Sequence, residues 1–114
     1  MKADALTMSL LFDYYGELLT EKQKTCFDLY YNQDFSLSEI AEQEQITRQG
    51  VHDSLVRAEA LLFDFEEKLG CVRRARESQK AMQTIEAAAR ELQSVAGAEN
   101  AAERILLAVQ SIKE

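Results

Sequence analysis

The stretch from Ser36 to Leu62, SLSEIAEQEQITRQGVHDSLVRAEALL, restricts the possible folds more than any other part of the chain. Residues that favour helix starts precede two segments in which apolar side chains recur at intervals of three and four. The small residue Ala41 stands where two closely crossing helices exclude a larger side chain. In this register, apolar residues occupy the positions of helix–helix contact: Ile40, Ile46 and Val51. The pattern predicts a helix-turn-helix.

Three residues depart from the usual pattern. Gln45 occupies the turn position where glycine takes a left-handed conformation without steric cost. Glu44 replaces an apolar core residue, and Gly50 lies inside the second helix at a cost of about 1 kcal/mol relative to alanine. The capping, small and apolar positions nevertheless agree, so the prediction is kept.

The rest of the chain also favours helices. Proline is absent and glycine occurs only four times in 114 residues. Thr20 with Gln23, and Ser36 with Glu39, have the spacing of a capping box. The second helix of the helix-turn-helix is expected to be the fourth helix of the chain. It should begin after Thr47, end at Gly70 and contain about 22 residues, or about 33 Å. Its apolar residues form a heptad-like seam: Val51, Leu55, Ala58, Leu62, Phe65 and Leu69. We expect the second half of this helix, towards Gly70, to project from the helix-turn-helix part of the chain. Its apolar side chains would then need to pack against the C-terminal tail or against a second copy of the protein.

Composition changes after Gly70. Residues 1–70 contain 6 Lys or Arg and 14 Asp or Glu, a net charge of −8, whereas residues 71–114 contain 7 and 6, a net charge of +1. The tail has no aromatic residue, and its apolar residues keep helical spacing on both sides of Gly97. We predict an all-α chain, with a helix-turn-helix domain over 1–70 and a C-terminal helical hairpin over 71–114. A partly frayed terminus is the alternative for the tail.

Composition also bounds the function. The net charge of −7 opposes nucleic-acid binding driven by charge alone. No signal peptide is expected at the start, and no apolar run approaches the ~18–20 residues of a membrane span. Cys26 and Cys71 lack the spacing of a metal site or redox pair and are expected to be reduced, structural thiols. These features predict a cytoplasmic protein without a cofactor.

The sequence does not favour an enzyme. His52 is the only histidine, so a catalytic triad or a histidine-rich metal site has too few residues, and no glycine-rich phosphate loop is present. Glu66 and Glu67 are expected to form a solvated face rather than an acid–base pair. The tyrosines lie at helical spacing beside leucines, which favours positions in the core or in the walls of a groove over base stacking: Tyr14, Tyr15, Tyr30 and Tyr31.

The candidate nucleic-acid-binding residues lie on the outer face of the fourth helix, where base edges or phosphates would be met. They are Thr47, Arg48, Gln49, His52 and Arg57. Only two of them are cations, and four acidic residues share the segment from Ser36 to Arg57, so phosphate contacts would be few. His52 is more simply explained as an exposed helix residue. A helix-turn-helix kept for packing or protein docking therefore remains open.

Residues 6–69 resemble the YlxM family of small bacterial proteins, which are similar to region 4 of sigma factors. The motifs that carry the resemblance are LLTEKQ, LYYNQDFSLSEIAE and RQGVHD, and nothing is transferred to the tail. By position, the family's recognition-helix motif falls on Thr47, Arg48, Gln49, Val51 and Asp53. The family is associated with the signal recognition particle pathway, often encoded beside its GTPase, and is described as a candidate for DNA binding.

The resemblance implies a non-enzymatic adaptor or regulator with a wingless helix-turn-helix, contacting the particle's GTPase or RNA. The alternative is a sigma-like transcriptional regulator that binds duplex DNA. A basic recognition surface would favour the alternative, and its near absence favours the adaptor. The seam and the apolar stripes of the tail, at 82–96 and 102–112, also predict a homodimer, with cover inside one chain as the rival.

Overall fold

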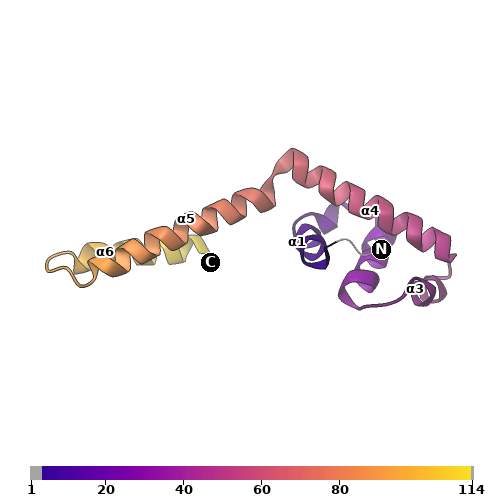
Figure 1. Cartoon of the computed structure of the whole chain (residues 1–114), viewed down its shortest axis with the longest axis horizontal. Helices are drawn as coiled ribbons and strands as arrows, with labels where there is room; N and C mark the ends of the chain where they lie inside the picture. The colour runs from indigo at the N-terminus through magenta and orange to yellow at the C-terminus, as the bar shows by residue number, and fades with distance from the viewer. Residues whose placement is uncertain (1–3, 114) are drawn as a thin grey trace. The chain divides into compact units, whose positions relative to one another are not determined.

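The computed structural model describes residues 4–113, which contain helices and turns but no β-strand (Figure 1). The α-helices of this range are α1 (Ala5–Tyr15), α2 (Glu21–Phe27), α3 (Leu37–Glu44), α4 (Arg48–Leu69), α5 (Cys71–Leu92) and α6 (Glu99–Lys113). A 3-10 turn, η1 (Gly16–Leu18), follows α1, and a π-helical segment, η2 (Asp28–Asn32), follows α2. The predicted all-α helix-turn-helix fold is confirmed. None of the helices between residues 4 and 113 combines the length and apolar character needed to cross a membrane.

The chain divides into two compact units between Val72 and Arg73. In the first unit, α1, α2 and α3 all pack against α4. The first four seam residues of α4 are completely buried: Val51, Leu55, Ala58 and Leu62. They share one core with Met8, Cys26, Phe27 and Ile40.

The far half of α4 does not project from this unit as expected. The rings of Tyr15 in α1 and Phe65 in α4 have centroids 6.0 Å apart. Only the last seam residue, Leu69, is substantially exposed, at 46%. The expectation that the tail or a second copy must cover the seam is therefore wrong, because α1 covers it.

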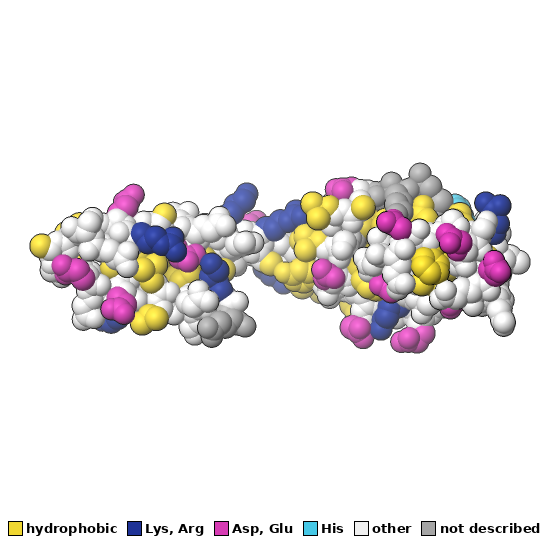
Figure 2. Space-filling view, turned by 90° about the horizontal axis from the view of Figure 1, so that it is seen from below, with side chains coloured by type: hydrophobic (Ala, Val, Ile, Leu, Met, Phe, Trp, Pro, Cys, Tyr) yellow, Lys and Arg dark blue, Asp and Glu magenta, His cyan; other side chains and the backbone are white. Residues whose placement is uncertain are grey.

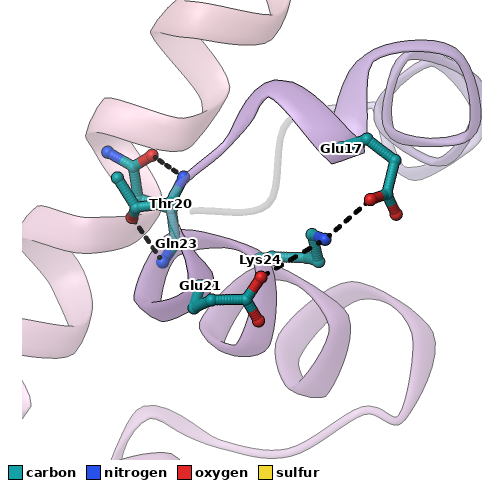
Figure 3. A network of polar contacts seen from close by, with 5 residues as sticks. All are labelled: Glu17, Thr20, Glu21, Gln23 and Lys24. Atoms are coloured by element: carbon teal, nitrogen blue, oxygen red, sulfur yellow. Dashed lines mark hydrogen bonds and ion pairs between the residues drawn. The ribbon is translucent and has the colours of Figure 1, made fainter.

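Both predicted capping boxes are present. Thr20 Oγ1 accepts the Gln23 backbone N–H at 3.2 Å, and Gln23 Oε1 accepts the Thr20 N–H at 3.0 Å (Figure 3). Ser36 and Glu39 make the equivalent pair of bonds at 3.1 and 2.9 Å. Figure 3 also shows Lys24, whose Nζ lies 3.1 Å from Glu17 Oε2 and links α2 to η1. These contacts fix where α2 and α3 begin.

Side chains of the first unit hold the beginning of α5. Gly70, at φ 64°, ends α4 in the left-handed conformation. The hydroxyl of Tyr15 donates to Glu66 Oε1 at 2.6 Å and accepts the Cys71 N–H at 3.0 Å. Glu66 Oε1 also accepts the Val72 N–H at 3.1 Å. The prediction of a solvated Glu66 is therefore wrong, whereas Glu67 is exposed.

The tyrosines differ in environment. Tyr15 is buried, and its burial and its bond to Glu66 raise its pKa to about 12. Tyr30 and Tyr31 are half-buried, and Tyr31 stacks on Phe27 with ring centroids 4.5 Å apart. Tyr15, Tyr30 and Tyr31 therefore belong to the core or pack against it, as expected, whereas Tyr14 is 47% exposed and lies outside the core.

The second unit is a hairpin of α5 and α6, which run side by side (Figure 1). Its buried residues within 73–113 are small: Ala89, Ala102 and Val109. Glu86 in α5 accepts from Lys113 of α6 at 3.1 Å and pairs with Arg90 at 3.6 Å. Larger apolar side chains stay exposed: Ile85, Leu92, Val95, Leu107 and Ile112.

Candidate nucleic-acid interface

The turn between α3 and α4 has the geometry that the sequence pattern required. Gln45 adopts φ 56° and ψ 44°, the left-handed conformation usually given to glycine. The Ile46 N–H donates to the carbonyl of Ala41 at 3.1 Å and closes the turn. Glu44, at the usual apolar position, is half-buried. The departures at these positions therefore leave the turn intact.

Thr47 is a capping residue, as predicted. Its Oγ1 accepts the Gly50 N–H at 2.9 Å. A Cβ at residue 50 would lie 3.1 Å from the same Oγ1. Glycine at this position thus leaves room for the cap, which gives a local reason for an otherwise unfavourable residue in a helix.

The other candidate residues lie on the solvent-facing part of α4, and two of them, Gln49 and His52, contact the carboxylate of Asp53. Arg48, Gln49 and Arg57 are exposed, and the His52 side chain is 43% exposed. Gln49 Nε2 donates to Asp53 Oδ1 at 2.9 Å. His52 Nδ1 lies 3.5 Å from the same oxygen, which is an ion pair only when the imidazole is protonated.

The electrostatics of this face centre on Asp53. Its pKa is lowered, first by the hydrogen bond from Gln49, then by His52, with a smaller effect of the Arg57 charge. A stabilised carboxylate therefore lies among the residues expected to meet nucleic acid. It repels phosphate and engages the amide of Gln49, which is a side chain suited to reading adenine.

A depression that no sequence pattern predicted lies between the start of α2 and α4. Its volume is about 360 Å³, and it is lined by Thr20, Lys22, Gln23, Gly50, Asp53, Ser54 and Arg57. A second depression of about 440 Å³ is lined by Gln23, Arg57, Ala60, Leu61 and Asp64. Lys22 thus adds a third cation to the face. Its position just after the capping residue Thr20 was the available signal.

The face therefore carries both signs of charge. Around the two depressions, Lys22 and Arg57 supply positive charge, and Asp53 and Asp64 supply negative charge. Arg48 adds an exposed cation in the first turn of α4. Within residues 4–113, no three His, Cys, Asp or Glu side chains are placed to hold a metal ion. The arrangement suits hydrogen bonds and ion pairs with a macromolecule that offers both charges.

Comparison with known proteins assigns the family. The sequence profile of UPF0122, described as "Putative helix-turn-helix protein, YlxM / p13 like", matches residues 2–101. The chain belongs to this family. The match includes α5, so the family relationship extends beyond the residues 6–69 on which the sequence motifs lie.

Individual relatives carry the same family name. A UPF0122 protein of Thermoanaerobacter sp. (strain X514) is 56% identical over 77 residues, which is 68% of this chain and 66% of the relative, just under two thirds. One of Caldanaerobacter subterraneus subsp. tengcongensis is 51% identical over 85 residues, covering 75% and 73%. One of Listeria innocua is 46% identical over 80 residues, covering 70% and 73%.

Proposed function

We propose that this UPF0122 protein is a non-enzymatic adaptor or regulator of the signal recognition particle. In this proposal the mixed-charge face of α2 and α4 contacts the particle's GTPase or its RNA. The pathway comes from the family resemblance, and it would place the protein in the cytoplasm. No catalysis or cofactor is proposed, since the chain's only histidine lies beside Asp53 on an exposed helix face.

The position of Asp53 is the observation that supports an adaptor over a DNA reader. Duplex readers place cations against phosphates and leave amide and guanidinium groups free for base edges. On α4, the Asp53 carboxylate engages Gln49 and lies among the cations. A protein surface with matching charges would satisfy both signs, whereas a phosphate backbone would satisfy only one.

DNA binding is the second candidate function. Arg48 and Gln49 are exposed in the first turn of α4, where a helix-turn-helix meets base edges. Under this alternative, the contact residues are those named from the sequence, with Thr47 as the cap of the recognition helix.

A capture experiment separates the two candidates. The tagged full chain is incubated with lysate, and separately with the purified GTPase, with and without RNase and DNase. We expect capture of the GTPase to survive both nucleases and to weaken in the Arg48→Ala/Arg57→Ala variant. A matched variant, Lys68→Ala/Arg90→Ala, removes the same charge from other exposed positions. Capture that DNase abolishes would instead favour the DNA reader.

We also propose that the chain forms a homodimer through the hairpin of α5 and α6. The supporting observation is the exposure of large apolar side chains on a two-helix unit; Leu107 is 62% exposed and Ile85 is 44% exposed. A four-helix bundle made by two hairpins would cover them. Figure 2 shows yellow side chains on the presented side of this unit.

Light scattering over a dilution series tests the dimer. Wild type is expected to be a dimer, and Ile85→Glu/Leu107→Glu a folded monomer. Phe63→Glu, at an exposed apolar residue of α4, is the matched control and should stay dimeric. Leu62 is unsuitable for such a test because it is completely buried in the first unit. A wild type that is monomeric at a protein concentration of tens of micromolar would contradict the proposal.

A further inference from the structure

The first turns of α5 concentrate positive charge in an otherwise acidic chain. Four cations, Arg73, Arg74, Arg76 and Lys80, share residues 73–80 with a single acid, Glu77. All four cations are exposed. Figure 2 shows several dark blue side chains where α5 begins. This segment has a net charge of +3, against −7 for the whole chain.

Part of this segment forms a shaped surface. A depression of about 260 Å³ is lined by Arg76, Gln79, Lys80 and Gln83. Arg76 and Lys80 are four residues apart on a helix, so their Cβ atoms lie roughly 5–6 Å apart on the same side. The two glutamines add amide donors between and beside the cations. Such donors are the groups that bind phosphate and sugar oxygens.

The α5 surface differs from the face of α4 in one decisive respect. The depression on α4 includes the carboxylate of Asp53, which is stabilised in its charged form. The α5 depression is lined by two cations and two amides, with no carboxylate among them. The one acid of this stretch, Glu77, pairs with Arg73 at 4.0 Å. A polyanion would therefore meet net positive charge on α5 and mixed charge on α4.

We infer that residues 73–83 of α5 form a contact for the phosphate backbone of a nucleic acid, with Arg76 and Lys80 as its main cations. The contact is independent of base sequence, because its donors are flexible side chains on an exposed helix face. The inference rests on the proposed adaptor function only in naming RNA as the expected source of the phosphates. With nucleic acid bound at α5, the face of α2 and α4 would remain available to bind a protein.

Fluorescence anisotropy with the full chain tests this contact. The probes are a labelled RNA stem–loop and a DNA duplex of equal length, each titrated over a series of salt concentrations. The variant Arg76→Gln/Lys80→Gln is compared with Arg90→Gln/Arg104→Gln, which removes the same charge elsewhere on the hairpin. Glutamine is well tolerated in helices, and circular dichroism confirms that both variants keep their helices.

Wild type is expected to bind, more tightly to RNA than to DNA, with affinity falling as salt rises. The Arg76→Gln/Lys80→Gln variant should lose about tenfold in affinity at low salt, and its log–log salt slope should fall by about 2. The control variant should stay within about twofold of wild type. Stronger binding to DNA would keep the phosphate contact and assign it to DNA.

Two results would overturn the inference. The first is an α5 variant whose affinity and salt slope match those of the control. The second is a wild type that binds neither nucleic acid but binds vesicles containing anionic lipid, or an acidic protein after nuclease treatment. Neither result touches nuclease-resistant capture of the GTPase, so failure here is distinguishable from failure of the proposed adaptor function.

Discussion

The two units of the chain bury apolar surface to very different extents. The first unit fully buries large side chains such as Phe27, Met8 and Leu55, because α1, α2 and α3 all pack on α4. In the second unit, the buried residues within 73–113 are two alanines and a valine. Four helices can enclose a core, whereas two helices share only a line of contact. The first unit therefore gains much more stability from its own apolar core than the second.

Charge follows the same division. The residues up to Gly70 carry a net charge of −8, whereas the tail carries +1 and begins with a basic stretch. In the first unit, acids are built into the structure: Glu39 accepts from the backbone in a capping box, and Glu66 holds the start of α5. The first unit, which has the large apolar core, is thus the acidic one. The second unit has a small core and exposes cations and apolar side chains.

The largest expected effect comes from truncating the core of the first unit. Leu55→Ala should lower the free energy of unfolding by about 3 kcal/mol, since Leu55 is fully buried and leaves a cavity. Leu107→Ala in the hairpin should cost less than about 0.5 kcal/mol in a monomer, because that side chain is mostly exposed. Urea denaturation, at a protein concentration low enough to keep the chain monomeric, measures the free energy of unfolding of both variants. Equal costs would break the contrast between the units.

A smaller effect is expected at the C-terminal end of the first unit. Tyr15→Phe removes the hydroxyl that accepts the Cys71 N–H and donates to Glu66. The midpoint of thermal unfolding should fall by about 5 °C. In wild type, the pKa of Tyr15 is raised from 10.0 to about 12. Its stabilising contribution is therefore complete below the unfolded-state pKa and is lost as pH rises through the folded-state pKa.

Thermal melts between pH 9 and 12 check this dependence, with Tyr14→Phe as the control because Tyr14 is exposed. The difference between wild type and Tyr15→Phe should shrink across that window. A difference that stays constant with pH would contradict a role for the neutral hydroxyl.

The hairpin turn should respond more weakly still. Gly97 adopts φ 85°, and a Cβ there would meet no atom within 4 Å, so Gly97→Ala introduces backbone strain without a clash. The expected cost is about 1 kcal/mol, which raises the exchange of α6 amide hydrogens about fivefold. Hydrogen exchange read by mass spectrometry resolves the two units. Equal acceleration in α4 would show that the units do not open separately.

Local signals in the sequence predicted helix boundaries in the first unit. The helix-ending and helix-starting residues each bond to a partner three or four positions away in the sequence, so a local pattern is enough to predict them. They are Thr20, Ser36, Thr47 and Gly70. The outward position of Arg48 and Gln49 followed from the same register.

Contacts between distant residues were not predictable in this way. Glu66 meets Tyr15 across 51 positions, and no periodic pattern marks that pair. The cover of the α4 seam by α1, and the depression that both Lys22 and Arg57 line, likewise depend on how helices cross. The π-helical segment Asp28–Asn32 also lacked a separate signal, since it continues α2.

The smallest expected effect concerns the turn of the helix-turn-helix. Gln45 in this turn and Gly97 in the hairpin turn both have a positive φ angle. Gln45→Gly should raise the free energy of unfolding by up to about 1 kcal/mol, because φ 56° is strained for a residue with a side chain. The gain is limited, since glycine also loosens the unfolded chain. Gly50→Ala is the contrasting variant: its gain in helix propensity is offset by a contact of 3.1 Å with Thr47 Oγ1, so little change is expected. Urea denaturation of both variants decides the matter. A destabilised Gln45→Gly would mean that the glutamine side chain itself stabilises the turn, unlike Gly97, which has no side chain.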